Sequence, residues 1–170
     1  MIAFGQSVAQ PAVTLYDIGI AVHMMSVVVA FGVTFAYPII FAVGARHGPR
    51  SLPLLHRVEY TIERWLVNPG LLVVVLAGAY LATKGHHWHE FFVQWGLGAA
   101  IVIGALVGSV MIPTAKRAEQ AAERDVAATA DGGAVVFGEQ YLRLARRLSV
   151  VGSLLSLLVL VTILFMVIRP

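Results

Sequence analysis

Four long apolar stretches dominate the pattern of hydrophobic and polar positions along the chain. They cover residues 18–45, 65–83, 91–115 and 148–168, and none of them contains Asp, Glu, Lys or Arg. A helix needs about 20 apolar residues to cross the hydrocarbon core of a bilayer. A surface helix of a soluble protein would instead show a polar face in every turn. The pattern therefore predicts an all-α, polytopic membrane protein with four transmembrane helices.

The polar residues between these stretches set the boundaries of the predicted elements. Residues 1–170 are expected to form a single membrane domain with spans over approximately 16–44, 65–83, 91–114 and 148–168. Residues 54–64 are predicted to form an amphipathic helix at the inner interface, and residues 115–130 a solvated helix. Pro38 and Pro69 are expected to bend the helices that contain them, and Pro113 lies near the inner end of the third span.

The composition agrees with lipid as the main solvent of the chain. Only 12% of the residues are charged and 59% are hydrophobic, whereas a soluble domain carries about 25% charged residues. The mean hydropathy is +0.84. The chain has no cysteine, which excludes disulfides, thiolate metal sites and cysteine nucleophiles.

The distribution of positive charge predicts the orientation. Of the 12 Lys and Arg residues, four lie in segment 46–64 and six in segment 116–147, leaving only Lys84 and Arg169 elsewhere. Cytoplasmic loops carry an excess of Lys and Arg, so both segments are predicted to be cytoplasmic and both termini to lie on the opposite side. The prediction is an antiparallel bundle in the bacterial inner membrane. Topology explains the basic excess, so the expected partner is the lipid bilayer and not nucleic acid.

Polar and small residues form a stripe along the first predicted span. At 100° per residue, seven of them fall within a sector of about 80°: Tyr16, Gly19, His23, Ser26, Ala30, Thr34 and Tyr37. An unpaired polar group in hydrocarbon is costly. The stripe is therefore expected to face protein or a water-filled cavity.

His23 is the candidate cofactor-binding residue of this stripe. Three roles fit an intramembrane histidine: an axial ligand of haem b, a copper ligand together with Met24 or Met25, or a proton relay. The alternative is a neutral imidazole that forms a hydrogen bond with a neighbouring helix. Without such a copper role, Met24 and Met25 are expected to pack in the bundle.

The third span carries a small residue at every fourth position: Gly96, Ala100, Gly104 and Gly108. A ridge without side chains lets another helix approach closely. The ridge is predicted to pack within the bundle, and the alternative is the seam of a homodimer.

Two further groups of residues resemble metal sites. His56, Glu59 and Glu63 share one helix face at i, i+3 and i+7, although the nearby Arg57 and Arg64 favour a solvated, charged face.

The other group is the histidine-rich segment 84–90, which is expected to be an outer hairpin. His86 and His89 are candidate metal ligands if that segment is helical, with Glu90 as an additional oxygen ligand. The alternative is a wet interfacial loop. The hairpin would also lie in the same half of the membrane as His23 and would supply a second ligand there.

Short motifs along nearly the whole chain carry a family resemblance: His23 with Gly32, Pro69 with Gly78, Trp95, Pro113, Tyr141 with Arg146-Arg147, and residues 166–170. Through them the chain resembles a family of bacterial four-helix proteins described as predicted integral membrane proteins of unknown function. More distantly, His23 is similar to the helix-one histidine of CopD-type copper-resistance proteins and HemJ-type protoporphyrinogen oxidases. This resemblance implies a haem or copper role in the membrane. In contrast to the HemJ pattern, the third span has no Lys or His.

Two functional hypotheses follow. The first is a non-enzymatic bundle, acting as an accessory or assembly subunit in a homo-oligomer or a larger membrane complex. The second is a haem- or copper-binding redox or metal-transport protein that uses His23. A channel or transporter is not favoured, because no span is expected to carry a second buried charge. No catalytic residue is assigned.

Overall fold

The computed structural model describes residues 12–130 and 133–169. Within these ranges the chain is helical and contains no strand. Four helices are long and apolar enough to cross a membrane, which confirms the predicted all-α fold with four apolar helices. We refer to them as rods 1 to 4. Met1 and Pro170, to which the prediction about the termini refers, lie outside the described residues.

Three of the four rods consist of several helical segments. Rod 1 (Leu15–His47) comprises α1 (Leu15–Phe31), η1 (Gly32–Phe35) and α2 (Tyr37–His47). Rod 2 (Pro49–Lys84) comprises η2 (Pro49–Ser51), α3 (Leu52–Ile62), η3 (Glu63–Val67) and α4 (Asn68–Lys84). Rod 3 (Phe91–Ala127) comprises α5 (Phe91–Leu106), η4 (Val107–Met111) and α6 (Ile112–Ala127). Rod 4 is the single helix α7 (Glu139–Ile168).

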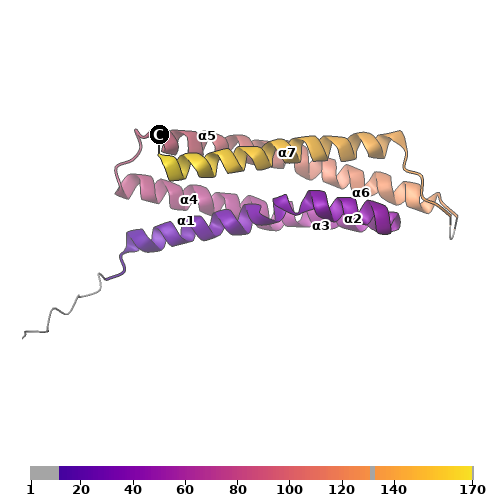
Figure 1. The fold of residues 1–170 in the computed structure, drawn as a ribbon, viewed down its shortest axis with the longest axis horizontal. Helices are drawn as coiled ribbons and strands as arrows, with labels where there is room; N and C mark the ends of the chain where they lie inside the picture. The colour runs from indigo at the N-terminus through magenta and orange to yellow at the C-terminus, as the bar shows by residue number, and fades with distance from the viewer. Residues whose placement is uncertain (1–11, 131–132, 170) are drawn as a thin grey trace, which may run out of the picture.

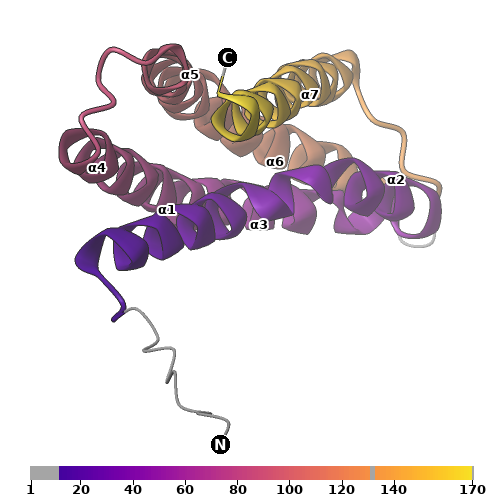
Figure 2. The same cartoon turned by 60° about the vertical axis from the view of Figure 1, so that its left-hand side comes forward.

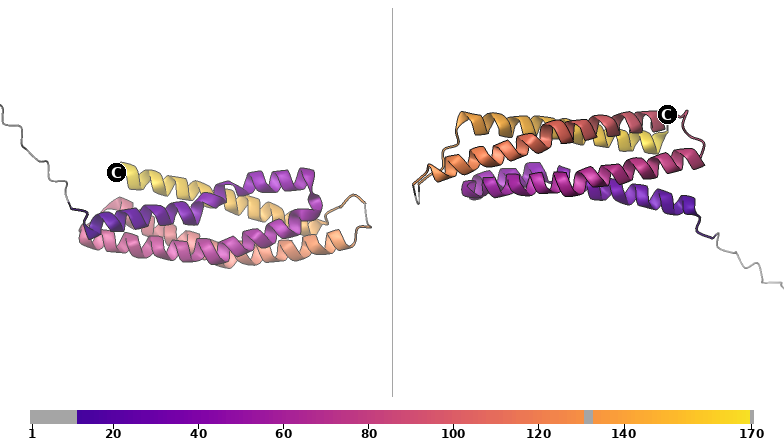
Figure 3. Two further views of the ribbon diagram at one scale, coloured as in Figure 1. Left: turned by 90° about the horizontal axis from the view of Figure 1, so that it is seen from below. Right: turned by 180° about the vertical axis from the view of Figure 1, so that it is seen from behind.

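Successive rods run in opposite directions and form an elongated bundle (Figure 1; Figure 2). Rod 1 packs on rod 2 mainly through α1 and α4, rod 2 on rod 3 mainly through α3 and α6, and rod 3 on rod 4 through α5, α6 and α7. Rods 1 and 4 meet mainly where α7 contacts η1, and Figure 3 shows them crossing there. The start of α1, the hairpin 85–90 and the end of α7 lie at one end, which we call the hairpin end (Figure 1). The end of α2, the start of α3, the end of α6 and the start of α7 form the other, basic end.

A capping box begins rod 1. The Asp17 amide donates a hydrogen bond to Thr14 Oγ1 at 3.2 Å, and the Thr14 amide donates one to the Asp17 carboxylate at 2.9 Å. Two backbone N–H groups that the first helical turn leaves without partners are satisfied in this way. The local sequence therefore fixes where α1 starts.

Each irregular helical turn inside the rods precedes a proline. A 3₁₀ turn precedes Pro38, and π turns over Glu63–Val67 and Val107–Met111 precede Pro69 and Pro113. Proline lacks the N–H that an α-helix uses, and its ring clashes with the carbonyl four residues earlier. The wider or tighter turn removes that carbonyl from its regular position. The irregularities predicted at Pro38 and Pro69 therefore occur one turn before the prolines, and Pro113 is preceded by one as well.

The polar and small stripe of rod 1 faces the protein, as predicted. All seven of its residues are buried or half-buried, and Ala30 is 0% exposed. Glycines make this contact close: a Cβ on Gly70 of α4 would lie 2.8 Å from the Ala30 Cβ, and one on Gly19 would lie 3.0 Å from the Tyr80 ring. The missing side chains let α1 and α4 approach closely.

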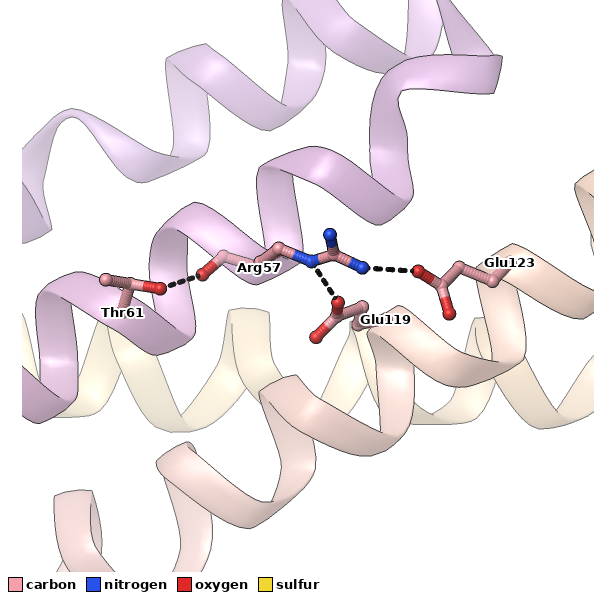
Figure 4. A network of polar contacts seen from close by, with 4 residues as sticks. All are labelled: Arg57, Thr61, Glu119 and Glu123. Atoms are coloured by element: carbon pink, nitrogen blue, oxygen red, sulfur yellow. Dashed lines mark hydrogen bonds and ion pairs between the residues drawn. The ribbon is translucent and has the colours of Figure 1, made fainter.

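An ion-pair network joins α3 to α6 near the basic end (Figure 4). Arg57 donates hydrogen bonds to Glu119 and, at 2.8 Å, to Glu123, while its carbonyl accepts one from Thr61 Oγ1 at 2.7 Å. The Arg57 side chain is 59% exposed, so each pair contributes about 1 kcal/mol or less. Buried Ala115, Ala118 and Ala122 of α6 provide the apolar part of the α6 contacts.

Candidate functional site

Two cavities flank the crossing of rods 1 and 4. The larger, of about 850 Å³, is lined by η1, α2 and the part of α7 from Tyr141 to Leu160, together with α3, η3 and η4. We call it the acidic cavity, because His56, Glu59 and Glu63 line it. The smaller, of about 470 Å³, is lined by α1, α4, α5 and the end of α7. We call it the His23 cavity, after its most distinctive polar residue.

Three apolar side chains line both cavities. Phe31, Ile103 and Val159 are 6%, 4% and 4% exposed, and they come from rods 1, 3 and 4. They form an apolar partition between a space lined by residues of the basic end and one lined by residues of the hairpin end.

The cluster of His56, Glu59 and Glu63 is buried, so the prediction of a solvated face is wrong. The three residues are 2%, 4% and 3% exposed, whereas Arg57 and Arg64 on the same helix are exposed. A transporter was not favoured because no span was expected to carry a second buried charge. Rod 2 carries two buried carboxyl groups, so this reason no longer holds. Leu52 and Val67, which are buried on the same face, continue the i, i+3/i+4 spacing to either side. That apolar continuation was the signal in the sequence that this face is internal.

Both ring nitrogens of His56 form hydrogen bonds. Nδ1 lies 2.9 Å from Glu59 Oε2, and Nε2 lies 3.3 Å from the Tyr141 hydroxyl. An ionised carboxylate only accepts hydrogen bonds, so Nδ1–H donates to Glu59 and, in the neutral ring, Nε2 accepts from Tyr141. The Phe41 ring lies 4.6 Å from the imidazole between ring centroids. Sequence reasoning assigned no role to Phe41 or Tyr141, because the three residues are brought together only by tertiary packing.

Two polar atoms near this cluster are buried without a hydrogen-bond partner among the described residues: Glu63 Oε2 and the Tyr37 hydroxyl. Both residues line the acidic cavity. Buried polar groups are nearly always hydrogen-bonded, and leaving one unsatisfied costs about 1–3 kcal/mol, more for a charged group. The arrangement is suited to a proton or to a ligand that satisfies these oxygens.

His23 has a defined tautomer. Its Nδ1 lies 3.0 Å from the Val74 carbonyl oxygen of α4, which accepts a hydrogen bond from Nδ1–H. Nε2 is then left as the lone-pair nitrogen, which is the form that ligates metals. The hydrogen bond to a neighbouring helix that sequence analysis gave as the alternative is therefore present. Metal or haem ligation through Nε2 stays a prediction.

Met24 and Met25 do not pack in the bundle, contrary to expectation. They are 61% and 60% exposed, because they lie beside the buried stripe and not on it. Gly78 of α4 faces His23, and a Cβ there would lie 3.2 Å from the His23 Cε1. The glycine thus leaves room for the imidazole.

The hairpin 85–90 forms turns and is not helical. The helical condition for a shared metal at His86 and His89 is thus not met, and both side chains are exposed. Across residues 12–130 and 133–169, no group of three His, Cys, Asp or Glu side chains is placed to hold a metal ion. His87 is the histidine of this hairpin that lines the His23 cavity. A metal role for His86 and His89 stays a prediction without support from a third side chain.

The small residues of rod 3 accommodate side chains of other rods. A Cβ on Gly96 would overlap the Met166 side chain of α7, and one on Gly104 would lie 3.2 Å from Leu71 of α4. Ala100 is half-buried. Gly108 has no described neighbour within 4 Å of such a Cβ. The ridge thus packs inside the bundle at Gly96 and Gly104, and a homodimer seam stays a prediction.

Comparison of the chain with protein-family models, with characterised proteins and with solved structures finds no match. The family resemblance drawn from short motifs therefore stays a hypothesis, and the geometry of the two cavities carries the functional argument.

Proposed function

We propose that this protein is a non-enzymatic, multi-pass protein of the bacterial inner membrane that binds a small ligand in the acidic cavity. The observation that carries the proposal is a cavity of about 850 Å³ with a cluster of buried acid and base side chains at one side. Ligand sites are typically clefts of about 300–1,000 Å³, mostly apolar, with a few convergent polar groups. An ionisable group within a membrane protein is a candidate for function by default.

The cluster is better suited to binding than to catalysis. His56 would be the natural acid or base, but hydrogen bonds to Glu59 and Tyr141 occupy both of its ring nitrogens. The ring is therefore held in place by Glu59 and Tyr141, and both of its nitrogens already have protein partners. Among the described residues, Glu63 Oε2 and the Tyr37 hydroxyl are buried without a hydrogen-bond partner, so both oxygens are free to bind a ligand.

The proposed orientation places segments 46–64 and 116–147 in the cytoplasm, because they hold ten of the 12 Lys and Arg residues and cytoplasmic loops are enriched in these residues. The hairpin 85–90, Leu15 and Arg169 then lie on the outer side. In this orientation the acidic cavity belongs to the cytoplasmic half and the His23 cavity to the outer half. An accessory or assembly role in a larger membrane complex is compatible with such a binding protein.

Filling the acidic cavity tests the proposal. Ser156 lines this cavity and is half-buried, whereas Ser109 is exposed and lines neither cavity. Protein extracted from its native membrane is expected to show a bound small molecule of defined mass by native mass spectrometry. Ser156→Phe should abolish that mass, because the phenyl ring takes its space, and Ser109→Phe should retain it. Wild-type protein that carries only lipid and detergent masses would refute the proposal.

A second candidate function is haem or copper binding at His23, favoured by one observation, the hydrogen bond from Nδ1 to the Val74 carbonyl oxygen. The imidazole fits as one ligand, because its Nε2 is left with a free lone pair. A haem or copper ion bound there would supply electron-transfer chemistry. Purified protein should then show a Soret band or stoichiometric copper that disappears in His23→Ala. Unchanged occupancy in this variant would remove His23 from the site.

A further inference from the structure

We propose that the acidic cavity binds hydrophobic organic cations, of the quaternary ammonium or phosphonium class, in competition with a proton at Glu63. This inference rests on the proposed ligand-binding function and adds the class of ligand.

The titratable side chains that line the cavity favour a positively charged ligand. Rod 2 contributes His56, Glu59 and Glu63, rod 1 contributes Tyr37, and rod 4 contributes Tyr141, while the lining residues of rod 3 are apolar. No Lys or Arg is among the described residues that line the cavity. A carboxylate without a cationic partner attracts positive charge and repels anions, and Glu63 has no such partner among the described residues of this lining. Anionic lipids and phosphates are thereby disfavoured.

The buried carboxyl group of Glu63 indicates a ligand, because it has no structural partner of its own among the described residues. Glu59 already has His56 as a partner at 2.9 Å, whereas Glu63 Oε2 is buried with no hydrogen-bond partner in the described part of the chain. The whole residue is only 3% exposed. A buried carboxyl group is stable when it is neutral or when a cation lies beside it. Proton and cation therefore exclude one another at this residue.

The remaining lining selects an organic cation over a hydrated metal ion. Phe31, Phe35 and Phe41 line the cavity from rod 1, and Phe137 and Tyr141 line it from the other side. Faces of aromatic rings attract cations, and they cannot replace the water shell of a small metal ion. A metal ion would need several oxygen or nitrogen ligands. The described residues offer no group of three such side chains in the right places.

Two probe ions of the same shape and opposite charge test the inference. Tetraphenylphosphonium should bind the purified full-length protein saturably in isothermal titration calorimetry, and tetraphenylborate should not. Affinity for the phosphonium should fall as the pH is lowered from about 8 to about 5, because protonation removes the negative charge that holds the cation. Glu63→Gln should weaken binding by about tenfold or more, because a buried charge partner is lost. Glu139→Gln, at an 80% exposed side chain, should leave binding unchanged.

The outcomes separate this inference from the proposed function. Equal binding of both ions that is lost in Ser156→Phe would overturn the cation selectivity and leave ligand binding in the cavity intact. Phosphonium binding that survives Ser156→Phe, or that is the same in Glu63→Gln and Glu139→Gln, would overturn the assignment of the site. Binding of neither ion, together with no co-purified mass, would overturn both proposals. The ion comparison and the pH series use wild-type protein, so they decide even if Glu63→Gln does not fold.

Discussion

Replacing His56 by alanine is expected to lower the free energy of unfolding by about 3–5 kcal/mol. The imidazole is 2% exposed and lies between the rings of Phe41, at 4.6 Å, and Tyr141, at 5.7 Å between centroids. Its removal leaves a void among these rings. It also deprives the buried Glu59 carboxylate and the Tyr141 hydroxyl of their shared partner, and an unpaired buried group costs more than the hydrogen bond itself was worth.

The measurement is equilibrium unfolding in mixed detergent micelles, followed by circular dichroism. His47→Ala is the matched control, because His47 is exposed and its Nδ1 contacts only the Val43 carbonyl of its own helix, at 3.3 Å. It should leave stability unchanged. Tyr141→Phe removes the hydroxyl and keeps the ring, so a loss of about 1 kcal/mol is expected. If His56→Ala and His47→Ala unfold at the same mole fraction of denaturing detergent, the hydrogen bonds of His56 do not stabilise the protein.

Single-cysteine labelling should give an all-or-none result for orientation. The chain has no cysteine, so each introduced thiol is the sole target. His89 in the hairpin and Gln120 in α6 are both exposed and lie at opposite ends of the bundle. An impermeant maleimide added outside right-side-out vesicles should label His89→Cys at once. Gln120→Cys should react only after the membrane is permeabilised, because the positive-inside rule places α6 in the cytoplasm.

The reverse pattern would invert the proposed orientation, and reaction of both thiols in sealed vesicles would mean that the rods do not cross the bilayer. A lipid-soluble maleimide should label both variants equally and thus confirms that both thiols are reactive. The result decides which face of the membrane supplies the ligand of the acidic cavity.

The sequence predicted the parts of the fold that depend on local pattern. Four apolar runs without a charged residue identify the four rods, because lipid imposes the same requirement on every exposed residue of a span. The stripe from Tyr16 to Tyr37 was also predicted to face protein or a water-filled cavity, because an unpaired polar group in hydrocarbon is costly. The positions of the breaks before Pro69 and Pro113 follow from backbone chemistry, although the choice of a π turn does not.

The candidate site was predicted less well, because it depends on contacts between distant residues. His56 and Glu59 are three residues apart, and local pattern placed them on one face. Whether that face is exposed to solvent or buried depends on Tyr141, which follows His56 by 85 positions in the chain. The neighbouring Arg57 misled the interpretation, since it reaches out to Glu119 and Glu123 on α6 and not to the carboxylates of its own helix.

The length of the rods bears on how the proposed ligand would reach Glu63. Rods 1 to 3 contain 33, 36 and 37 residues, which corresponds to about 50–55 Å of helix, against a hydrocarbon thickness of about 30 Å. Trp65 is exposed beside Arg64, and such an aromatic residue prefers the head-group level, so in the proposed orientation we expect Glu63 to lie at about that depth. A hydrophobic cation that has partitioned into the inner leaflet would then already be concentrated at the depth of the proposed site. The leaflet would act as its reservoir, and occupancy would follow the mole fraction of the cation in lipid more closely than its concentration in the cytosol.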